Sequence, residues 1–397
     1  MDDEGWKMAV KLKQMIKNEM EKDKTLAKRI TKLIGYANPS TLYKFLNNEK
    51  RDFEEFNTML TIIRELFPDK EKELMMEIAQ TLDPNKHITR VALEYATITK
   101  HEELKKYLIE KLAGAKNIES KDFAFIYELD DKLAKKEISS HEGIELINRK
   151  GFTSFEARVF SKIVLIYEYY KLGIIDILFD IAKLLNMELK SIEEKYLLQS
   201  YKARLGSVMT GVCLHKGLIN EAREHGTNVI NSDIPYSIKA VTHLFMGNSY
   251  IMESYEKALK YLNEGLKITE KFNLENTKTQ IIRSLNFVMN YWGEKPDYLN
   301  HNSNEIPDLH EVAFFYIRNS NYKMAIDILD SMNLDSMNEL QKGFHYFYRG
   351  LIGNSKEYFY KSVTHFKMSG DCFYRKLPLI ELRKLGEHEM ILNALSV

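Results

Sequence analysis

The apolar residues of this chain recur three and four positions apart, which is the spacing of amphipathic helices. Between residues 53 and 66 this spacing is kept by Phe53, Phe56, Met59, Leu60, Ile63 and Leu66, and Pro68 follows to end the helix. No alternating apolar and polar run of useful length predicts strands, and seven prolines interrupt the chain. The pattern therefore predicts an all-α protein whose helices are joined by short turns.

Residues 25–51 have the layout of a helix-turn-helix. We expect Thr25 to cap the first helix and Gly35 to end it in a left-handed backbone conformation. The apolar positions of this helix are Leu26, Ile30, Leu33 and Ile34. Asn38 is expected to cap a second helix with Pro39 at its first position, where a missing N–H costs nothing. This arrangement favours DNA binding, and the alternative is a capped helical hairpin with a solvated polar face.

The second helix has one apolar side and one polar side. Its expected core residues are Leu42, Phe45 and Leu46. The residues expected to face outward are Ser40, Thr41, Tyr43, Lys44 and Asn47. Hydroxyl and amide groups bind base edges or phosphates, and lysine supplies charge. With Asn38, and with Lys28 and Arg29 of the first helix, they are our candidate DNA-binding residues.

Charge is concentrated at the start of the chain, although the whole chain has 57 basic and 57 acidic residues. From Lys7 to Arg51 twelve Lys or Arg oppose four acidic residues, a net charge of +8, while residues 1–6 contribute −3 and the remainder −5. A local positive field favours contact with phosphates of a double-stranded DNA operator. The alternative is a solvated lysine-rich helix.

A repeat in the second half predicts the architecture. Gly211 and Ala222 recur as Gly247 and Ala258, both displaced by 36 residues. A period in the mid-thirties is typical of tetratricopeptide-like arrays, whose concave surface suits extended peptides. Weaker copies are expected at 159–185, 312–332 and 344–366.

The last residues form a leucine-rich segment. Its apolar residues are Leu377, Leu379, Ile380, Leu382, Leu385, Ile391, Leu392 and Leu395. They predict a terminal helical pair that either caps the array or pairs two chains, and we favour a homodimer because a head that reads two half-sites needs one. We therefore predict three parts: a DNA-binding head at 1–67, a repeat domain with a peptide-binding concave face at 68–374, and a capping or dimerisation segment at 375–397.

Other classes of protein lack support in the sequence. Motifs for nucleotide binding, serine hydrolases and zinc proteases are absent, so we expect no enzyme, no cofactor and no metal site. The apolar run at 163–179 is broken by Glu168, Lys171 and Asp176, which excludes a membrane span. Cys213 and Cys372 form no CxxC motif and are expected to be core thiols of a protein in the host bacterial cytoplasm.

Several strings of the chain resemble the arbitrium receptor family, AimR, within the wider class of repeat-containing, peptide-sensing regulators of Gram-positive bacteria and their phages. They are LYKFLN at 42–47, LDPNKHITRVALEYA at 82–96, GNSYIM at 247–252, NFVMNYWGEK at 286–295, DLHEVAFFYI at 308–317, HYFYRGL at 345–351 and FKMSGDCFYRKLPLIEL at 366–382. The resemblance implies a dimeric phage transcription factor that controls lysogeny and is switched off by a short secreted peptide.

Matching motifs also imply the ligand-binding residues. Asn248 corresponds to a side chain that holds the peptide backbone, and Ile251, Phe287 and Phe373 correspond to apolar walls. Glu311 and Asp371 correspond to an acidic pair that receives an arginine of the peptide, in keeping with the strong bonds that carboxylates form with guanidinium groups. The signal is therefore expected to contain a basic residue. For each position the alternative is plain packing or a solvated acid.

The chain departs from the family pattern at two positions. Gly211 stands where better-known members have an asparagine, and Ser237 stands where they have an arginine. Lys239 is nearby, but two residues along a helix turn it about 200° away. The signal is therefore expected to differ from theirs. The competing functional hypothesis is a repeat protein that modulates a signalling protein and does not bind DNA.

Overall fold

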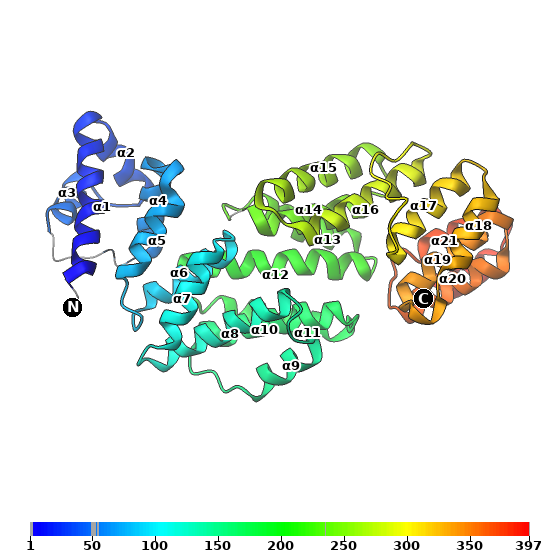
Figure 1. The fold of residues 1–397 in the computed structure, drawn as a ribbon, viewed down its shortest axis with the longest axis horizontal. Helices are drawn as coiled ribbons and strands as arrows, with labels where there is room; N and C mark the ends of the chain where they lie inside the picture. The colour runs from blue at the N-terminus through cyan, green and yellow to red at the C-terminus, as the bar shows by residue number, and fades with distance from the viewer. Residues whose placement is uncertain (1–2, 49–52, 54, 235, 397) are drawn as a thin grey trace. The chain divides into compact units, whose positions relative to one another are not determined.

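The computed structural model describes residues 3–48, 53, 55–234 and 236–396, with the side chains of residues 3–10 and 236 left out. Its regular elements in these ranges are all helices, as Figure 1 shows, so the predicted all-α class is confirmed. The chain divides into two compact units: residues 1–168 with 183–202, and residues 169–182 with 203–397. The predicted division at residues 67 and 374 remains a prediction.

The first unit begins with a group of five α-helices and one short 3-10 helix. They are α1 (Asp3–Lys22), α2 (Leu26–Leu33), α3 (Pro39–Asn47), α4 (Phe56–Leu66), η1 (Pro68–Lys70) and α5 (Glu71–Thr81). Helix α2 contacts α3 and α4, and α1 contacts α2, α3 and α5. Their shared core includes Leu12, Ile16, Leu26, Ile30, Leu42, Leu46 and Ile63, all buried. Burial of one apolar face per short helix supplies the stability that helices of this length lack alone.

Two expectations for the first helix of this group are wrong. Thr25 precedes α2, but its side chain makes no capping bond and its hydroxyl instead donates to Asp23 Oδ1 over 2.7 Å. Leu33 is 51% exposed, because Ala27 and Thr31 complete the buried face together with Leu26 and Ile30. The expectation for Gly35 is confirmed, since its φ of +73° lies in the left-handed region that glycine tolerates best.

The rest of the first unit consists of helical hairpins. The helices are α6 (His87–Ile98), α7 (Glu102–Ala113), α8 (Ile118–Ala134) and α9 (Ser140–Arg149). The residues of α10 (Phe155–Lys171), α11 (Asp176–Leu189) and α12 (Lys195–His215) are divided between the two units. Buried Glu94 accepts hydrogen bonds from Tyr127 and Ser200, so this carboxylate is paired inside the first unit.

The second unit also consists of helices. Its further helices are α13 (Ile219–Ile230), α14 (Tyr236–Ser249), α15 (Tyr255–Phe272), α16 (Glu275–Trp292), α17 (Ile306–Arg318), α18 (Tyr322–Ser331), η2 (Leu334–Ser336), α19 (Glu339–Gly353), α20 (Lys356–Met368), α21 (Lys376–Lys384) and α22 (Glu389–Ser396). Successive helices pack on one another, most extensively α14 on α15 and α19 on α20. The predicted copies at 159–185, 312–332 and 344–366 fall on the successive helices α10 and α11, α17 and α18, and α19 and α20. The tetratricopeptide-like repeat itself remains a prediction.

The glycines of the repeat have different neighbours. A Cβ on Gly247 would lie 2.6 Å from Leu262 of α15, so this glycine does allow its own pair to approach closely. A Cβ on Gly211 would lie 2.7 Å from the ring of Phe245 in α14 and 2.9 Å from the hydroxyl of Tyr170 in α10. The side chains nearest to Gly211 therefore come from α14 and α10, so this glycine allows close packing against other hairpins.

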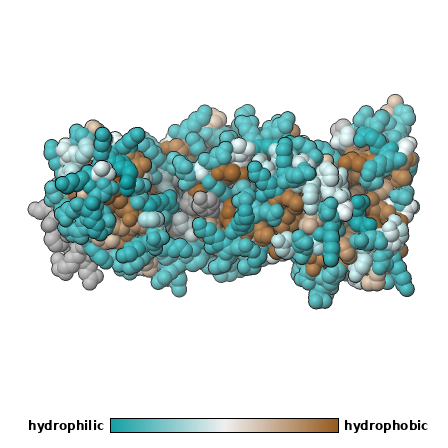
Figure 2. Space-filling view, turned by 90° about the horizontal axis from the view of Figure 1, so that it is seen from above, coloured by the Kyte–Doolittle hydropathy of each residue, from teal (hydrophilic) through white to brown (hydrophobic). Residues whose placement is uncertain are grey.

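The C-terminal leucines pack within the chain. Leu377, Leu379, Leu382 and Leu392 are at most 8% exposed and belong to the core of the second unit. Met390 and Ile391 of α22 are 74% and 44% exposed. On the face of the molecule in Figure 2, hydrophilic residues predominate and apolar residues appear as separate groups.

Candidate DNA-binding and ligand-binding sites

Helix α3 has the start that a recognition helix needs. Asn38 has an extended backbone, and its side-chain oxygen accepts a hydrogen bond from the N–H of Thr41 over 3.2 Å. Pro39 is the first helical residue. Leu42 and Leu46 are buried, and with Phe45 they fix the side that faces the core. The predicted cap and the predicted buried face are confirmed.

The opposite side of α3 is open to solvent. Ser40, Thr41, Tyr43, Lys44 and Asn47 are all exposed, as predicted. The hydroxyls of Ser40 and Thr41 both donate to Asn38 Oδ1, so the amide oxygen is occupied by the cap. Asn38 can consequently offer only N–H donors to a nucleic acid, which suits a phosphate better than the paired contact that reads adenine. The DNA contacts themselves remain a prediction.

The two basic candidates of α2 differ in their surroundings. Lys28 and Arg29 are both exposed. Arg29 Nε lies 2.7 Å from Glu65 Oε1, and its Nη1 lies 3.8 Å from Asp23 Oδ2. These acids reduce the charge that Arg29 presents to phosphates, so Lys28 is the stronger candidate. Lys50 and Arg51 of the predicted basic segment lie outside the described residues.

Glu311 of α17 is the first of the two acidic candidates in the second unit. It is 7% exposed, and its Oε1 accepts a hydrogen bond of 3.2 Å from the hydroxyl of Tyr348. Its other oxygen, Oε2, is buried without a partner in the described structure. Burial raises the pKa of Glu311 to about 8, although bonds from Tyr348 and Asn290 oppose the shift. The carboxyl group is thus mostly neutral at pH 7.

Asp371 lies in the turn between α20 and α21 and is 2% exposed. Its Oδ2 lies 3.1 Å from Nδ1 of His215, and its Oδ1 accepts the backbone N–H of Tyr374 over 2.5 Å. Burial raises the pKa of Asp371 to about 6, while the charge of His215 and the backbone bonds lower it. Each acid of the expected pair therefore has its own local partners.

Tyr374 connects the surroundings of the two acids. Burial and the charge of Asp371 raise the pKa of its hydroxyl strongly, and Tyr170 and Glu311 add smaller contributions. Its ring centroid lies 6.2 Å from that of Phe287 and 4.9 Å from that of Phe344. Both carboxyl groups are therefore within electrostatic reach of one side chain that also touches the aromatic core.

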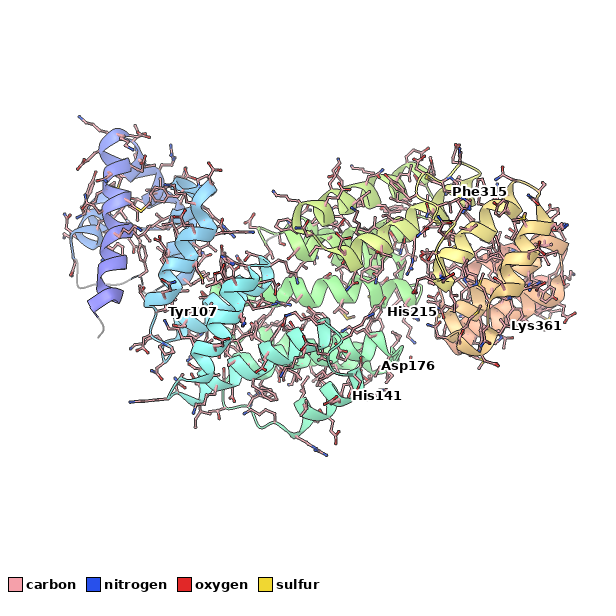
Figure 3. The ribbon with its side chains drawn as sticks, in the orientation of Figure 1. Tyr107, His141, Asp176, His215, Phe315 and Lys361 are labelled. Atoms are coloured by element: carbon pink, nitrogen blue, oxygen red, sulfur yellow. The ribbon has the colours of Figure 1, made fainter. Side chains whose placement is uncertain are left out.

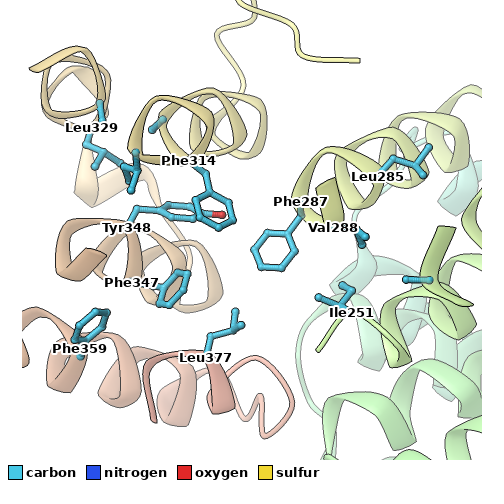
Figure 4. Packing of buried hydrophobic residues seen from close by; sticks show 14 of the residues in the cluster. Ile251, Leu285, Phe287, Val288, Phe314, Leu329, Phe347, Tyr348, Phe359 and Leu377 are labelled. Carbon is cyan, nitrogen blue, oxygen red and sulfur yellow. The ribbon is translucent and has the colours of Figure 1, made fainter. Parts of the chain in front are cut away.

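The apolar candidates have little free surface. Ile251, Phe287 and Phe373 are 1%, 5% and 3% exposed. Figure 4 shows Phe287 of α16 directed toward Phe314 and Tyr348, and the rings of Phe287 and Phe314 lie 5.6 Å apart. In this conformation the three side chains are mainly core residues, so a ligand would contact them only over small areas. Their role as walls of a peptide site remains a prediction.

Four buried oxygens of the second unit have no hydrogen-bond partner in the described structure. They are the side-chain oxygens of Asn248, Asn286 and Asn290 and Oε2 of Glu311. The amide nitrogens of Asn286 and Asn290 donate to the carbonyl oxygens of Tyr298 and Glu311, which leaves the amide oxygens free. Unpaired buried oxygens are costly, and N–H donors such as those of a peptide or a guanidinium group would satisfy them.

The two positions that depart from the family pattern, Gly211 and Ser237, and the nearby Lys239 lie in different surroundings. The rings of Tyr170 and Phe245 pack edge to face 6.1 Å apart and fill the space where a side chain at position 211 would lie. Lys239 donates to the carbonyl oxygen of Ser232 over 2.6 Å, and burial lowers its pKa. Ser237 is 8% exposed.

Sequence reasoning did not find His215, Tyr348 or Asn290 as partners of the acids. His215 lies 156 positions before Asp371, and no local spacing signals that they meet. The described residues contain no group of three or more His, Cys, Asp or Glu that could hold a metal ion. In the same residues, no helix is both long and apolar enough to cross a membrane. Cys213 is buried as predicted, whereas Cys372 is only half-buried.

Comparison with known proteins gives consistent matches. The family model "AimR transcriptional regulator-like" matches residues 71–384. The AimR transcriptional regulator of Bacillus phage phi3T is 33% identical over 383 residues, which cover 96% of this chain and 100% of the relative. That of Bacillus phage SPbeta is 29% identical over 380 residues, covering 96% and 98%.

Solved structures agree with these relatives. A selenomethionine form of phAimR is similar with a TM-score of 0.74 and 34% identity, covering 97% of this chain and 100% of the other. A structure of phAimR with a ligand is similar with a TM-score of 0.72 and 31% identity, covering 84% and 99%.

Proposed function

This chain belongs to the AimR family of transcriptional regulators, and we propose that it controls the lysis–lysogeny decision of a phage by binding an operator until a short secreted arbitrium peptide switches it off. Its function is thus regulation and not catalysis. The signal would contain a basic residue, and the protein would act as a homodimer in the cytoplasm of the host.

The observation that carries the proposal is helix α3. An Asn38 cap, Pro39 at the first position and a buried apolar side orient a polar side that includes Lys44 and Asn47 toward solvent. A structural hairpin does not require an exposed row of hydroxyl, amide and ammonium groups. A major groove does, since bases are read by hydrogen bonds and phosphates by charge.

Support for peptide binding comes from the second unit. Its four unpaired buried oxygens include Glu311 Oε2, and the acid is held neutral by burial until a cation arrives. An arginine side chain would supply both the charge and the N–H donors. Gating would then follow from a shift in population toward a conformation whose two heads no longer match the half-sites.

Support for a homodimer is limited to the end of the chain. The leucines of α21 and α22 are used inside the second unit, but Met390 and Ile391 remain exposed beside them. Apolar side chains exposed on a terminal helix are suited to pairing with a second copy.

The test is fluorescence anisotropy on DNA fragments that surround the gene, with and without the short peptide encoded immediately downstream. We expect tight, salt-sensitive binding that the peptide abolishes. A double change of Lys44 and Asn47 to Ala should remove DNA binding without altering peptide binding. If no fragment is bound in low salt, the head docks on a protein, and the alternative of a repeat protein that modulates a signalling protein takes the place of this proposal.

A further inference from the structure

His215 lies at the end of α12, where Figure 3 labels it, and its ring stands between two oxygen acceptors. Nδ1 lies 3.1 Å from Asp371 Oδ2, and Nε2 lies 3.2 Å from the carbonyl oxygen of Ser369. The backbone oxygen of His215 also accepts the N–H of Cys372 over 2.8 Å. His215 therefore makes three contacts with the turn that carries Asp371.

The two acceptors indicate the charge of the ring. A neutral imidazole has one N–H donor and one acceptor nitrogen, so it can satisfy only one of two neighbouring oxygens without help. An imidazolium ion donates from both nitrogens and satisfies both. Its charge also favours the ionised form of Asp371, which is 2% exposed and would otherwise be costly to ionise.

The turn has further contacts besides those with His215. Asp371 Oδ1 accepts the N–H of Tyr374, and the guanidinium of Arg375 donates to the carbonyl oxygen of Ser396 over 2.5 Å. The ring of Tyr170 lies 6.5 Å from that of His215. Among the described residues, Arg375, Tyr374, Tyr170 and Cys372 are further titratable groups around the pair, and the guanidinium of Arg375 also donates to Cys372 Sγ over 3.5 Å.

We propose that His215 is a positioning residue of the ligand site, which keeps Asp371 ionised and in place so that the receptor selects a peptide with a cationic side chain. The inference deepens the proposed function and rests on it for the ligand. Asp371 already has Tyr374 at Oδ1 and His215 at Oδ2, and Glu311 supplies a second carboxyl group whose Oε2 has no hydrogen-bond partner in the described structure.

The first test compares two synthetic copies of the peptide encoded downstream of the gene, one with its arginine and one with citrulline, which keeps the shape and removes the charge. We expect the wild-type protein to prefer arginine roughly tenfold or more. His215→Ala should lose most of this preference by weakening the arginine peptide alone. If His215→Ala does not fold, His215→Gln keeps one donor without the charge and should show the same loss.

The matched control is His365→Ala. His365 Nδ1 lies 2.7 Å from Glu339 Oε2, so this change removes a histidine–carboxylate pair from the same unit. It should keep the preference. Equal preference in His215→Ala and the wild type would overturn the role of His215 while leaving the regulator intact. A wild type that binds neither peptide would overturn both.

A second measurement needs no ligand. In protein labelled with nitrogen-15 histidine, the signals of His215, identified by their loss in His215→Ala, should show both ring nitrogens protonated at pH 7. Asp371→Asn should convert the ring to the neutral form. A neutral ring in the wild-type protein would contradict the inference directly.

Discussion

Replacing Glu311 by Gln should stabilise the unliganded protein at neutral pH and weaken its response to peptide. The change is nearly isosteric, and the amide oxygen can still accept from Tyr348. What it removes is an ionisable group whose pKa is raised from 4.5 to about 8 by burial. A buried acid of this kind makes the folded state harder to ionise than the unfolded chain.

The size and sign follow from proton linkage. Between pH 4.5 and about pH 8 the unfolded chain has released a proton that the folded protein retains. Each pH unit in this window therefore costs up to about 1.4 kcal/mol of folding stability, and the loss at pH 7 is about 3 kcal/mol. Stability from this group is complete below pH 4.5 and falls as the pH rises, which is the reverse of a salt-bridged carboxylate.

The assay is thermal unfolding of the wild type and Glu311→Gln at pH 5 and pH 8. The variant should gain about 3 kcal/mol relative to the wild type between these values, at about 2 to 4 °C per kcal/mol. Glu339→Gln is the control, because bonds from His365 and Lys342 lower the pKa of Glu339 and predict the opposite sign. A difference in melting temperature between Glu311→Gln and wild type that is the same at both pH values would refute the reasoning.

Affinity for the peptide should rise with pH, whereas the folding stability of the wild type falls. A guanidinium group binds the ionised carboxylate, so wild-type affinity for an arginine-containing peptide should rise with pH up to about pH 8. Glu311→Gln should weaken that peptide by at least a few-fold, roughly what one charge-assisted hydrogen bond contributes, and should flatten the pH dependence. Titration calorimetry at pH 6 and pH 8 measures both effects.

Lys44→Ala should lower the log–log slope of DNA affinity against salt concentration by about 0.9. Arg29→Ala should change this slope less, because the Arg29 side chain is already paired with Glu65 at 2.7 Å. Equal slopes for both variants would contradict the assignment. Gly35→Ala should destabilise the protein by about 1 kcal/mol, because alanine tolerates the φ of +73° less well than glycine. Nothing lies within 4 Å of the added Cβ, so a steric clash does not contribute. A melting temperature equal to that of the wild type would contradict the prediction. Leu382→Ala should lower the free energy of unfolding by about 2 to 5 kcal/mol. Met390→Ser should leave stability nearly unchanged and should shift the molecular mass measured by sedimentation from that of a dimer toward that of a monomer. A wild-type protein that is fully monomeric would contradict the second expectation.

Local chemistry made part of the fold predictable. The cap at Asn38, the proline that follows it and the buried face of α3 depend on residues within a few positions of one another, and all three are confirmed. Leu33 was misjudged because several faces of a short helix can carry an apolar stripe, and tertiary contacts chose Ala27 and Thr31. Thr25 failed as a cap because its own backbone is already helical, with φ −83° and ψ −17°, whereas a capping residue has an extended backbone.

The ligand site was less accessible to sequence reasoning. The acids Glu311 and Asp371 came from resemblance, and their partners Tyr348 and His215 came only from the structure. A histidine–carboxylate contact between residues 156 positions apart leaves no periodic mark in a sequence, and neither does the burial that sets a pKa. The same holds for the leucines of α21, whose pattern fits a cap and a dimer seam equally well.

The crowding around Gly211 limits how this receptor could change its signal in evolution. With the Phe245 ring and the Tyr170 hydroxyl less than 3 Å from where its Cβ would lie, no larger side chain can be accepted at position 211 until one of them has shrunk or turned away. A lineage that starts here must therefore pass through a change at position 245 or 170 before position 211 becomes open to selection. The order in which these substitutions occur, and not only their number, would therefore separate this receptor from relatives that bind other peptides.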